Sequence, residues 1–142
     1  MKIFVRRIAL PFLIVTMLAT AIAQDKTKPA TEAAQKWLAM VDAGHYAESW
    51  NAAASSFKEH LSSQDWQSAL QKVRAPLGTV QSRVLKSAVH QTDLPNAPKG
   101  DYYVIRYATD FAEAKGTVET VVPMLEKDGT WKVSGYFIKP AQ

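Results

Sequence analysis

The stretch D-Y-Y-V-I-R-Y-A-T-D-F-A, residues 101–112, decides the fold class. It is rich in aromatic and β-branched residues, which are typical of strands, and its apolar residues alternate with a period of two. One face of such a strand carries Tyr103, Ile105, Tyr107 and Phe111. The stretch therefore predicts a long strand with an aromatic face directed into the core.

Three further strands are predicted around it. Upstream, residues 78–91 have a strand-like but irregular pattern that suggests a bulge. Downstream, residues 116–126 form the next strand, and Pro123 within it indicates an edge position or a bulge. Asp128-Gly129 is a hairpin-turn signal that leads into a last strand over residues 131–139.

The residues before this region have the helical period instead. A first helix is predicted from an N-cap at Thr31 to a C-terminal glycine, Gly44. A second begins at about Tyr46 and carries its apolar stripe as far as Phe57, and a third is capped by Ser62 or Ser63. About three helices followed by four strands indicate an α+β fold, with helices packed on one face of a four-stranded antiparallel sheet.

The first 23 residues predict export. A short basic segment precedes an uncharged run of 16 residues, 8–23, which ends in the small-x-small pattern Ala21-Ile22-Ala23. We expect a cleavable signal helix, with cleavage between Ala23 and Gln24, because about 20 apolar residues are needed to span a bilayer. The alternative is an uncleaved anchor. The expected organisation is a signal peptide over 1–23, a flexible leader over 24–30 and a single domain over 31–142.

Charge and cysteine content exclude several classes of protein. The chain has 17 Lys and Arg against 13 Asp and Glu, and removal of the signal takes away three cations, so nucleic-acid binding is disfavoured. The absence of cysteine excludes disulfides, thiolate metal sites and a cysteine nucleophile. No metal or other cofactor is expected, because the three histidines lack ligand spacing. An exported chain of this kind fits a bacterial periplasm or a secreted protein, with no stable membrane span after cleavage.

Three stretches carry a family resemblance. W-L-A-M-V-D-A-G-H-Y-A-E-S-W (37–50), W-Q-S-A-L-Q-K-V-R-A-P-L-G (66–78) and D-G-T-W-K-V-S-G-Y (128–136) resemble the opening, middle and end of a family of small exported bacterial proteins, the domain of unknown function 4019. The resemblance covers nearly all of the chain after the signal. It implies no catalytic residue, because none is assigned in that family.

A second likeness is to the nuclear-transport-factor-2-like cone. The hairpin pattern Gly129-x-Trp-Lys-Val and the run from Asp42 to Trp50 are similar to features of that superfold. The likeness implies that the sheet is curved around the helices in a cone-like arrangement. It leaves function open, because the superfold hosts enzymes, binding modules and assembly domains alike.

Arg83 and Glu119 are candidate binding residues, because each is a charged residue among apolar or β-branched neighbours in a predicted strand. Either both point to the concave side, as a buried ion pair or as the polar end of a pocket, or both lie on the solvent face. Tyr107 and Trp131 are candidates for lining a ligand cavity, and core packing is the competing interpretation. The predicted inner face comprises Tyr103, Tyr107, Phe111, Trp131 and Phe137.

No nucleophile elbow or phosphate-binding loop is present, and no catalytic residue is assigned. We therefore expect a non-enzymatic module that binds a small apolar ligand, a protein partner or a second copy of itself. The alternative is a small cone-pocket enzyme of the hydrolase, isomerase or dehydratase type, with polar residues such as Arg83, Glu119 or Asp110. A cavity of a few hundred Å³ beside Arg83 or Glu119 would favour the enzyme, and an interior filled by aromatic side chains would exclude it. Homodimerisation is predicted from the apolar residues on both faces of the strand over 102–111.

Overall fold

Four helices precede four strands in the computed structural model, which describes residues 25–140. The predicted signal helix and its cleavage site at Ala23 and Gln24 lie outside the described residues. The elements in chain order are α1 (Thr27–Asp42), α2 (Tyr46–Asn51), α3 (Ser55–His60), α4 (Ser63–Arg74), the short 3-10 turn η1 (Ala75–Leu77), β1 (Val80–Gln91), β2 (Tyr102–Phe111), β3 (Ala114–Leu125) and β4 (Trp131–Lys139).

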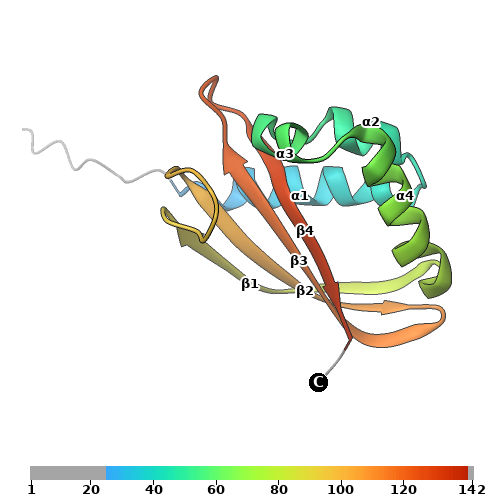
Figure 1. Ribbon diagram of the computed structural model, residues 1–142. Helices are drawn as coiled ribbons and strands as arrows, with labels where there is room; N and C mark the ends of the chain where they lie inside the picture. Colours follow the sequence, from blue (N-terminus) through green and yellow to red (C-terminus); the bar gives the residue numbers. More distant parts are fainter. Residues whose placement is uncertain (1–24, 141–142) are drawn as a thin grey trace, which may run out of the picture.

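The strands form one antiparallel sheet in the order β1-β2-β3-β4. Figure 1 shows the helices gathered on one side of this curved sheet. The predicted α+β class and the four-stranded antiparallel sheet are therefore confirmed. Among the described residues, no helix combines the length and the apolar character that crossing a membrane requires.

Each pair of neighbouring strands contains at least one register shift. In β1 the register shifts twice, once between Leu85 and Ser87, which agrees with the predicted bulge. In β4 an extra residue, Ser134, has no partner, because Val122 lies opposite Gly135 whereas Pro123 lies opposite Val133. The bulge accommodates a proline in a central strand, since proline cannot donate a ladder hydrogen bond. Of the two settings expected for Pro123, the bulge is correct and the edge is not.

The first helix begins five residues earlier than predicted, with Lys26 instead of Thr31 at the N-cap and Thr27 as its first residue. Thr31 lies inside it, and its hydroxyl donates to the carbonyl of Thr27 at 2.9 Å instead of capping the helix. Pro29 is tolerated because the first-turn N–H groups of a helix have no intrahelical partner. Ala30 is fully buried, so residues 27–30 of the predicted leader are an ordered part of the domain.

The second predicted helix is two short helices, α2 and α3. Between them Ala53 and Ala54 are fully buried, and the backbone N–H of Ala54 donates to the carbonyl of Val133 on β4 at 2.8 Å. The helix is thus interrupted at the point where the backbone forms a hydrogen bond to the sheet. Periodicity alone does not reveal this interruption, because the apolar stripe continues through it.

The predicted helix end at Gly44 is confirmed, and of the two serines that were predicted to cap the last helix, Ser62 is the one that does so. Gly44 has a φ of 77°, and the N–H of His45 donates to the carbonyl of Met40 at 2.9 Å, which is a Schellman motif. The hydroxyl of Ser62 accepts from the N–H of Asp65 at 3.1 Å and caps α4. Both boundaries depend on a residue's local backbone chemistry, so they are visible in the sequence.

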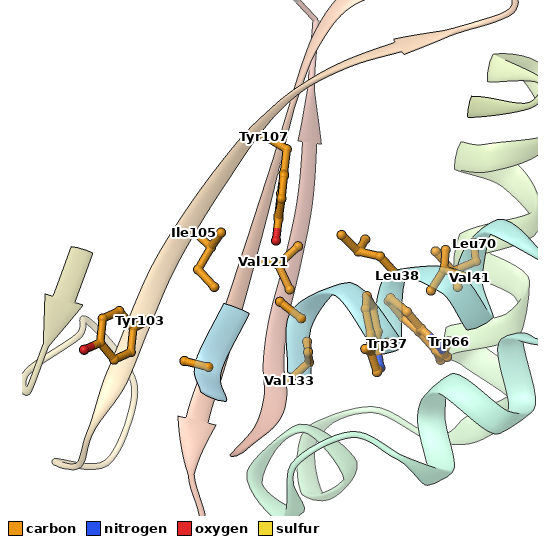
Figure 2. Close-up of a cluster of buried hydrophobic side chains, with 12 residues drawn as sticks. Trp37, Leu38, Val41, Trp66, Leu70, Tyr103, Ile105, Tyr107, Val121 and Val133 are labelled. Carbon is orange, nitrogen blue, oxygen red and sulfur yellow. The ribbon is translucent and has the colours of Figure 1, made fainter. Parts of the chain in front are cut away.

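Large side chains fill the space between the helices and the sheet (Figure 2). The ring centroids of Trp37 and Trp66 lie 5.7 Å apart, and Tyr136 packs edge-on to Trp37 at 5.3 Å. Both indole N–H groups are satisfied by Ser49, whose carbonyl accepts from Trp37 and whose hydroxyl accepts from Trp66. The interior is therefore a packed core of aromatic and aliphatic residues.

Candidate functional site

The sheet register brings Arg83 and Glu119 together on the face that the helices cover. Arg83 lies opposite Thr109, and Glu119 lies opposite Tyr107. The Nε of Arg83 donates to Oε1 of Glu119 at 2.8 Å, with Glu119 fully buried and the Arg83 side chain 16% exposed. Of the two interpretations of these residues, the inward one is correct and the solvent-facing one is wrong.

Two further donors complete the coordination of the Glu119 carboxylate. The hydroxyl of Thr109 donates to Oε1 at 2.6 Å, and the hydroxyl of Tyr136 donates to Oε2. A buried charge is tolerated only when it is paired and hydrogen-bonded. Three donors on one carboxylate meet that requirement.

Asp42 at the end of α1 extends this arrangement. It accepts from both terminal nitrogens of Arg83, at 2.7 and 3.0 Å, and from Arg74 of α4 at 2.8 Å. Arg74 also donates to the Tyr136 hydroxyl at 3.3 Å. We call Asp42, Arg74, Arg83 and Glu119 the charged cluster. With Thr109 and Tyr136, it joins α1, α4 and all four strands.

The pKa shifts follow from this geometry. Burial alone would raise the pKa of Asp42, but the hydrogen bonds and charges of Arg83 and Arg74 outweigh it and hold that pKa below its ordinary value. Burial also opposes the charge of Arg83, yet Asp42 and Glu119 raise its pKa. Burial and the charge of Glu119 raise the pKa of Tyr136. At neutral pH Asp42 is ionised and Tyr136 is protonated.

Five depressions on the surface of the described residues lie away from the charged cluster. They have volumes of about 200 to 610 Å³, and all are open to solvent. Neither Arg83 nor Glu119 lines any of these five. Asp110 is also elsewhere, and accepts from the N–H of Gly116 at 2.7 Å in the hairpin between β2 and β3. The charged cluster is an ion-pair network that links α1 and α4 to the sheet.

Tyr107 and Trp131 lie in different surroundings. Tyr107 is 2% exposed in the core, and its hydroxyl has no hydrogen-bond partner among the described residues. Burial raises its pKa. Trp131 is half-buried, packs on Tyr103 with ring centroids 5.4 Å apart, and lines an open groove of about 480 Å³ between α1 and the start of β4.

Phe137 is on the opposite face from the one predicted. It lies opposite Thr120 and is 57% exposed, whereas Trp131 and Val133 earlier in β4 are directed to the core. The extra residue Ser134 reverses the alternation between Val133 and Tyr136. A period-two reading of residues 131–139 therefore places Phe137 wrongly.

We call the face of the sheet away from the helices the outer face. The sequence did not predict which exposed apolar residues lie together on it. Its exposed apolar residues come from three strands: Val84 at 54%, Val89 at 49%, Val118 at 36% and Phe137 at 57%. A hollow of about 240 Å³ lies over β1 and β2 and is lined by Ser87, Val89, Gln91, Leu94, Val104 and Arg106. The feature of the sequence that pointed to this surface was the presence of apolar residues on both faces of β2.

A metal site is not apparent in residues 25–140, where no group of three or more His, Cys, Asp or Glu side chains is placed to hold an ion. Comparison with curated proteins and with solved structures gives no significant match. One family matches, over residues 33–136, and it is described as a protein of unknown function, DUF4019. The match spans α1 from its second turn to the middle of β4, and so the chain belongs to the DUF4019 family.

Proposed function

We propose that the protein is an exported, non-enzymatic protein-interaction module of the bacterial periplasm, and that the outer face of the sheet is its contact surface. The observation that carries this proposal is the contrast between the two faces. The inner face is filled by the aromatic core and the charged cluster. The outer face leaves four large apolar side chains in solvent.

The exposed apolar surface is large enough to drive binding. The exposed fractions of Val84, Val89, Val118 and Phe137 together equal about two fully exposed side chains. Burial of each such side chain stabilises a complex by about 1.5–3 kcal/mol. These side chains lie on one face of the sheet, on either side of exposed Arg106, and exposed apolar surface rimmed by polar residues marks interaction sites on soluble proteins. A single exposed apolar residue, such as Val73 on α4, does not by itself indicate an interaction site.

A second candidate function is the binding of a small apolar ligand in the groove that Trp131 lines. Its lining includes Ala33, Trp37 and Met40 of α1 and Val133 of β4. We expect 1-anilinonaphthalene-8-sulfonate to bind there and Ala33→Phe to abolish that binding by filling the groove. Unchanged fluorescence enhancement in Ala33→Phe would exclude this candidate.

Site-specific photo-crosslinking in cells that export the protein tests the interaction surface. A photoreactive residue at Phe137 is expected to form a discrete adduct, and one at Gln71, exposed on α4, is expected to form none. Mass spectrometry of the adduct identifies the partner, and the N-terminal peptide is expected to begin at Gln24. Equal adducts from the two positions, or none from Phe137, would overturn the proposed surface. An N-terminus at Met1 would overturn cleavage of the signal.

A further inference from the structure

We infer that the occupant of the outer face is a second copy of this chain, related by a two-fold axis that runs along the strands between β2 and β3. This inference rests on the proposed function, because it requires the outer face to be a contact surface. It adds the identity of the partner and the residues that meet. The geometry comes from the sheet register.

One row of residues crosses the whole outer face. Ser87 of β1 pairs with Arg106 of β2, Arg106 with Thr120 of β3, and Thr120 with Phe137 of β4. Neighbouring strands lie about 4.8 Å apart, so Ser87 and Phe137 are about 14 Å apart. They are also equally distant from the line midway between β2 and β3.

A two-fold axis along that line exchanges the two ends of the row. It places Phe137 of each copy over the partner's β1 near the position of Ser87, where the hollow of about 240 Å³ lies. Phe137 is the most exposed of the large apolar residues, and the hollow has Val89 and Val104 in its lining. The Phe137 ring and the hollow thus occupy symmetric positions on one face, as an isologous interface requires.

The rest of the face fits the same arrangement. Arg106 is exposed, lines the hollow and forms no salt bridge with another described residue, so its guanidinium is available to the ring of the partner's Phe137 as a cation–π contact. Ala108 and Val118 pair across the axis itself. The small side chain of Ala108 lets the two sheets approach closely there.

The area of the face sets the size of the contact. Its shortest strand has nine residues, so the four strands span about 19 by 30 Å, or roughly 600 Å² in plan. One end of this face is already covered, because Tyr102 on it is 1% exposed and donates its hydroxyl to the carbonyl of Pro98 in the loop before β2. Standard interfaces use about 800 Å² of accessible surface on each partner. The uncovered part of the outer face is therefore smaller than one side of a standard interface, which fits a weak two-fold contact.

Sedimentation equilibrium of the exported protein, with charge substitutions and a rescue, tests the arrangement. We expect a mass of two chains at about 50 μM, and we expect Phe137→Lys to weaken association at least 30-fold, because a lysine would replace the most exposed apolar side chain of the face and would add a positive charge near the partner's Arg106. Val89→Asp is expected to weaken it by a smaller factor. The double variant Phe137→Lys/Val89→Asp is expected to recover at least 10-fold of the loss, because the introduced lysine of one copy would face the introduced aspartate of the other.

The rescue is specific because residues 89 and 137 lie on opposite edge strands of one copy and do not touch. The matched control is Phe137→Lys/Val73→Asp, in which the second substitution changes a similarly exposed valine on α4 and is expected to give no recovery. Circular dichroism confirms that each variant is folded. A single-chain mass for the wild-type protein, or a double variant no better than Phe137→Lys, would overturn the inference. If a different protein is crosslinked at Phe137, the proposed function is supported, and the inference that a second copy of this chain occupies the outer face is refuted.

Discussion

Substitution of Glu119 by glutamine is the sharpest test of how the charged cluster acts. Glutamine has nearly the same shape as glutamate, so the change creates no cavity; it removes the charge and replaces one acceptor oxygen by an NH2 donor. Its amide group would face at least one of the donors that Glu119 now accepts from, namely Arg83, Thr109 and Tyr136. The substitution therefore places two hydrogen-bond donors against each other in the core, and it leaves Arg83 with one anionic partner fewer.

The expected loss of stability is about 3 kcal/mol. Removal of one partner of a buried ion pair costs about 3–5 kcal/mol. The lower end applies because Arg83 is 16% exposed and keeps its two hydrogen bonds to Asp42. Domains are stable by about 5–15 kcal/mol, so the variant remains folded at room temperature but is much weaker.

Urea denaturation at pH 7, followed by tryptophan fluorescence, measures this loss. With a slope of about 2 kcal/mol per molar urea, the midpoint is expected to fall by about 1.5 M. Glu113→Gln is the matched control, since Glu113 is exposed in the hairpin between β2 and β3 and its midpoint is expected to stay within about 0.25 M of the wild type. Midpoints that agree for the two variants would refute the claim that the charged cluster holds the layers together.

Three further substitutions test one member of the charged cluster and two buried hydroxyl groups of the core. The folded-state pKa of Asp42 is lowered, so the stability that its charge contributes is present above about pH 4 and is lost as the pH falls through the lowered value. Asp42→Asn is expected to flatten this dependence of stability on pH, which urea midpoints at about pH 7, 4 and 2.5 measure. The same fall in midpoint with pH in the variant as in the wild type would contradict this expectation. Ser49→Ala is expected to cost about 1–3 kcal/mol, because the buried indole N–H of Trp66 loses its acceptor, and calorimetry that shows an unchanged melting temperature would disprove this. Tyr107→Phe is expected to be neutral or to stabilise the protein by up to about 1 kcal/mol, because its buried hydroxyl has no partner among the described residues, and a clear loss of stability in urea would show that the hydroxyl is used.

The candidate site was only partly predictable. Arg83 and Glu119 were selected as charged residues among apolar neighbours, and the structure pairs them. Their link to Asp42 and Arg74 was not predicted, because it joins residues 32 to 41 positions apart in the chain. Such contacts depend on how α1 and α4 pack on the sheet, and no local pattern reports that packing.

The sequence by itself determined the features that depend on local backbone chemistry. Gly44 and Ser62 end and begin helices because of their own conformational and hydrogen-bonding properties, and the period-two pattern of residues 101–112 places β2 with its aromatic face inward. Tertiary structure decided the rest. Bonding of Ala54 to Val133 divides α2 from α3, and the unpaired Ser134 turns Phe137 outward. A side chain's face depends on the register with its neighbour strand, and one inserted residue reverses it without changing the composition of either strand.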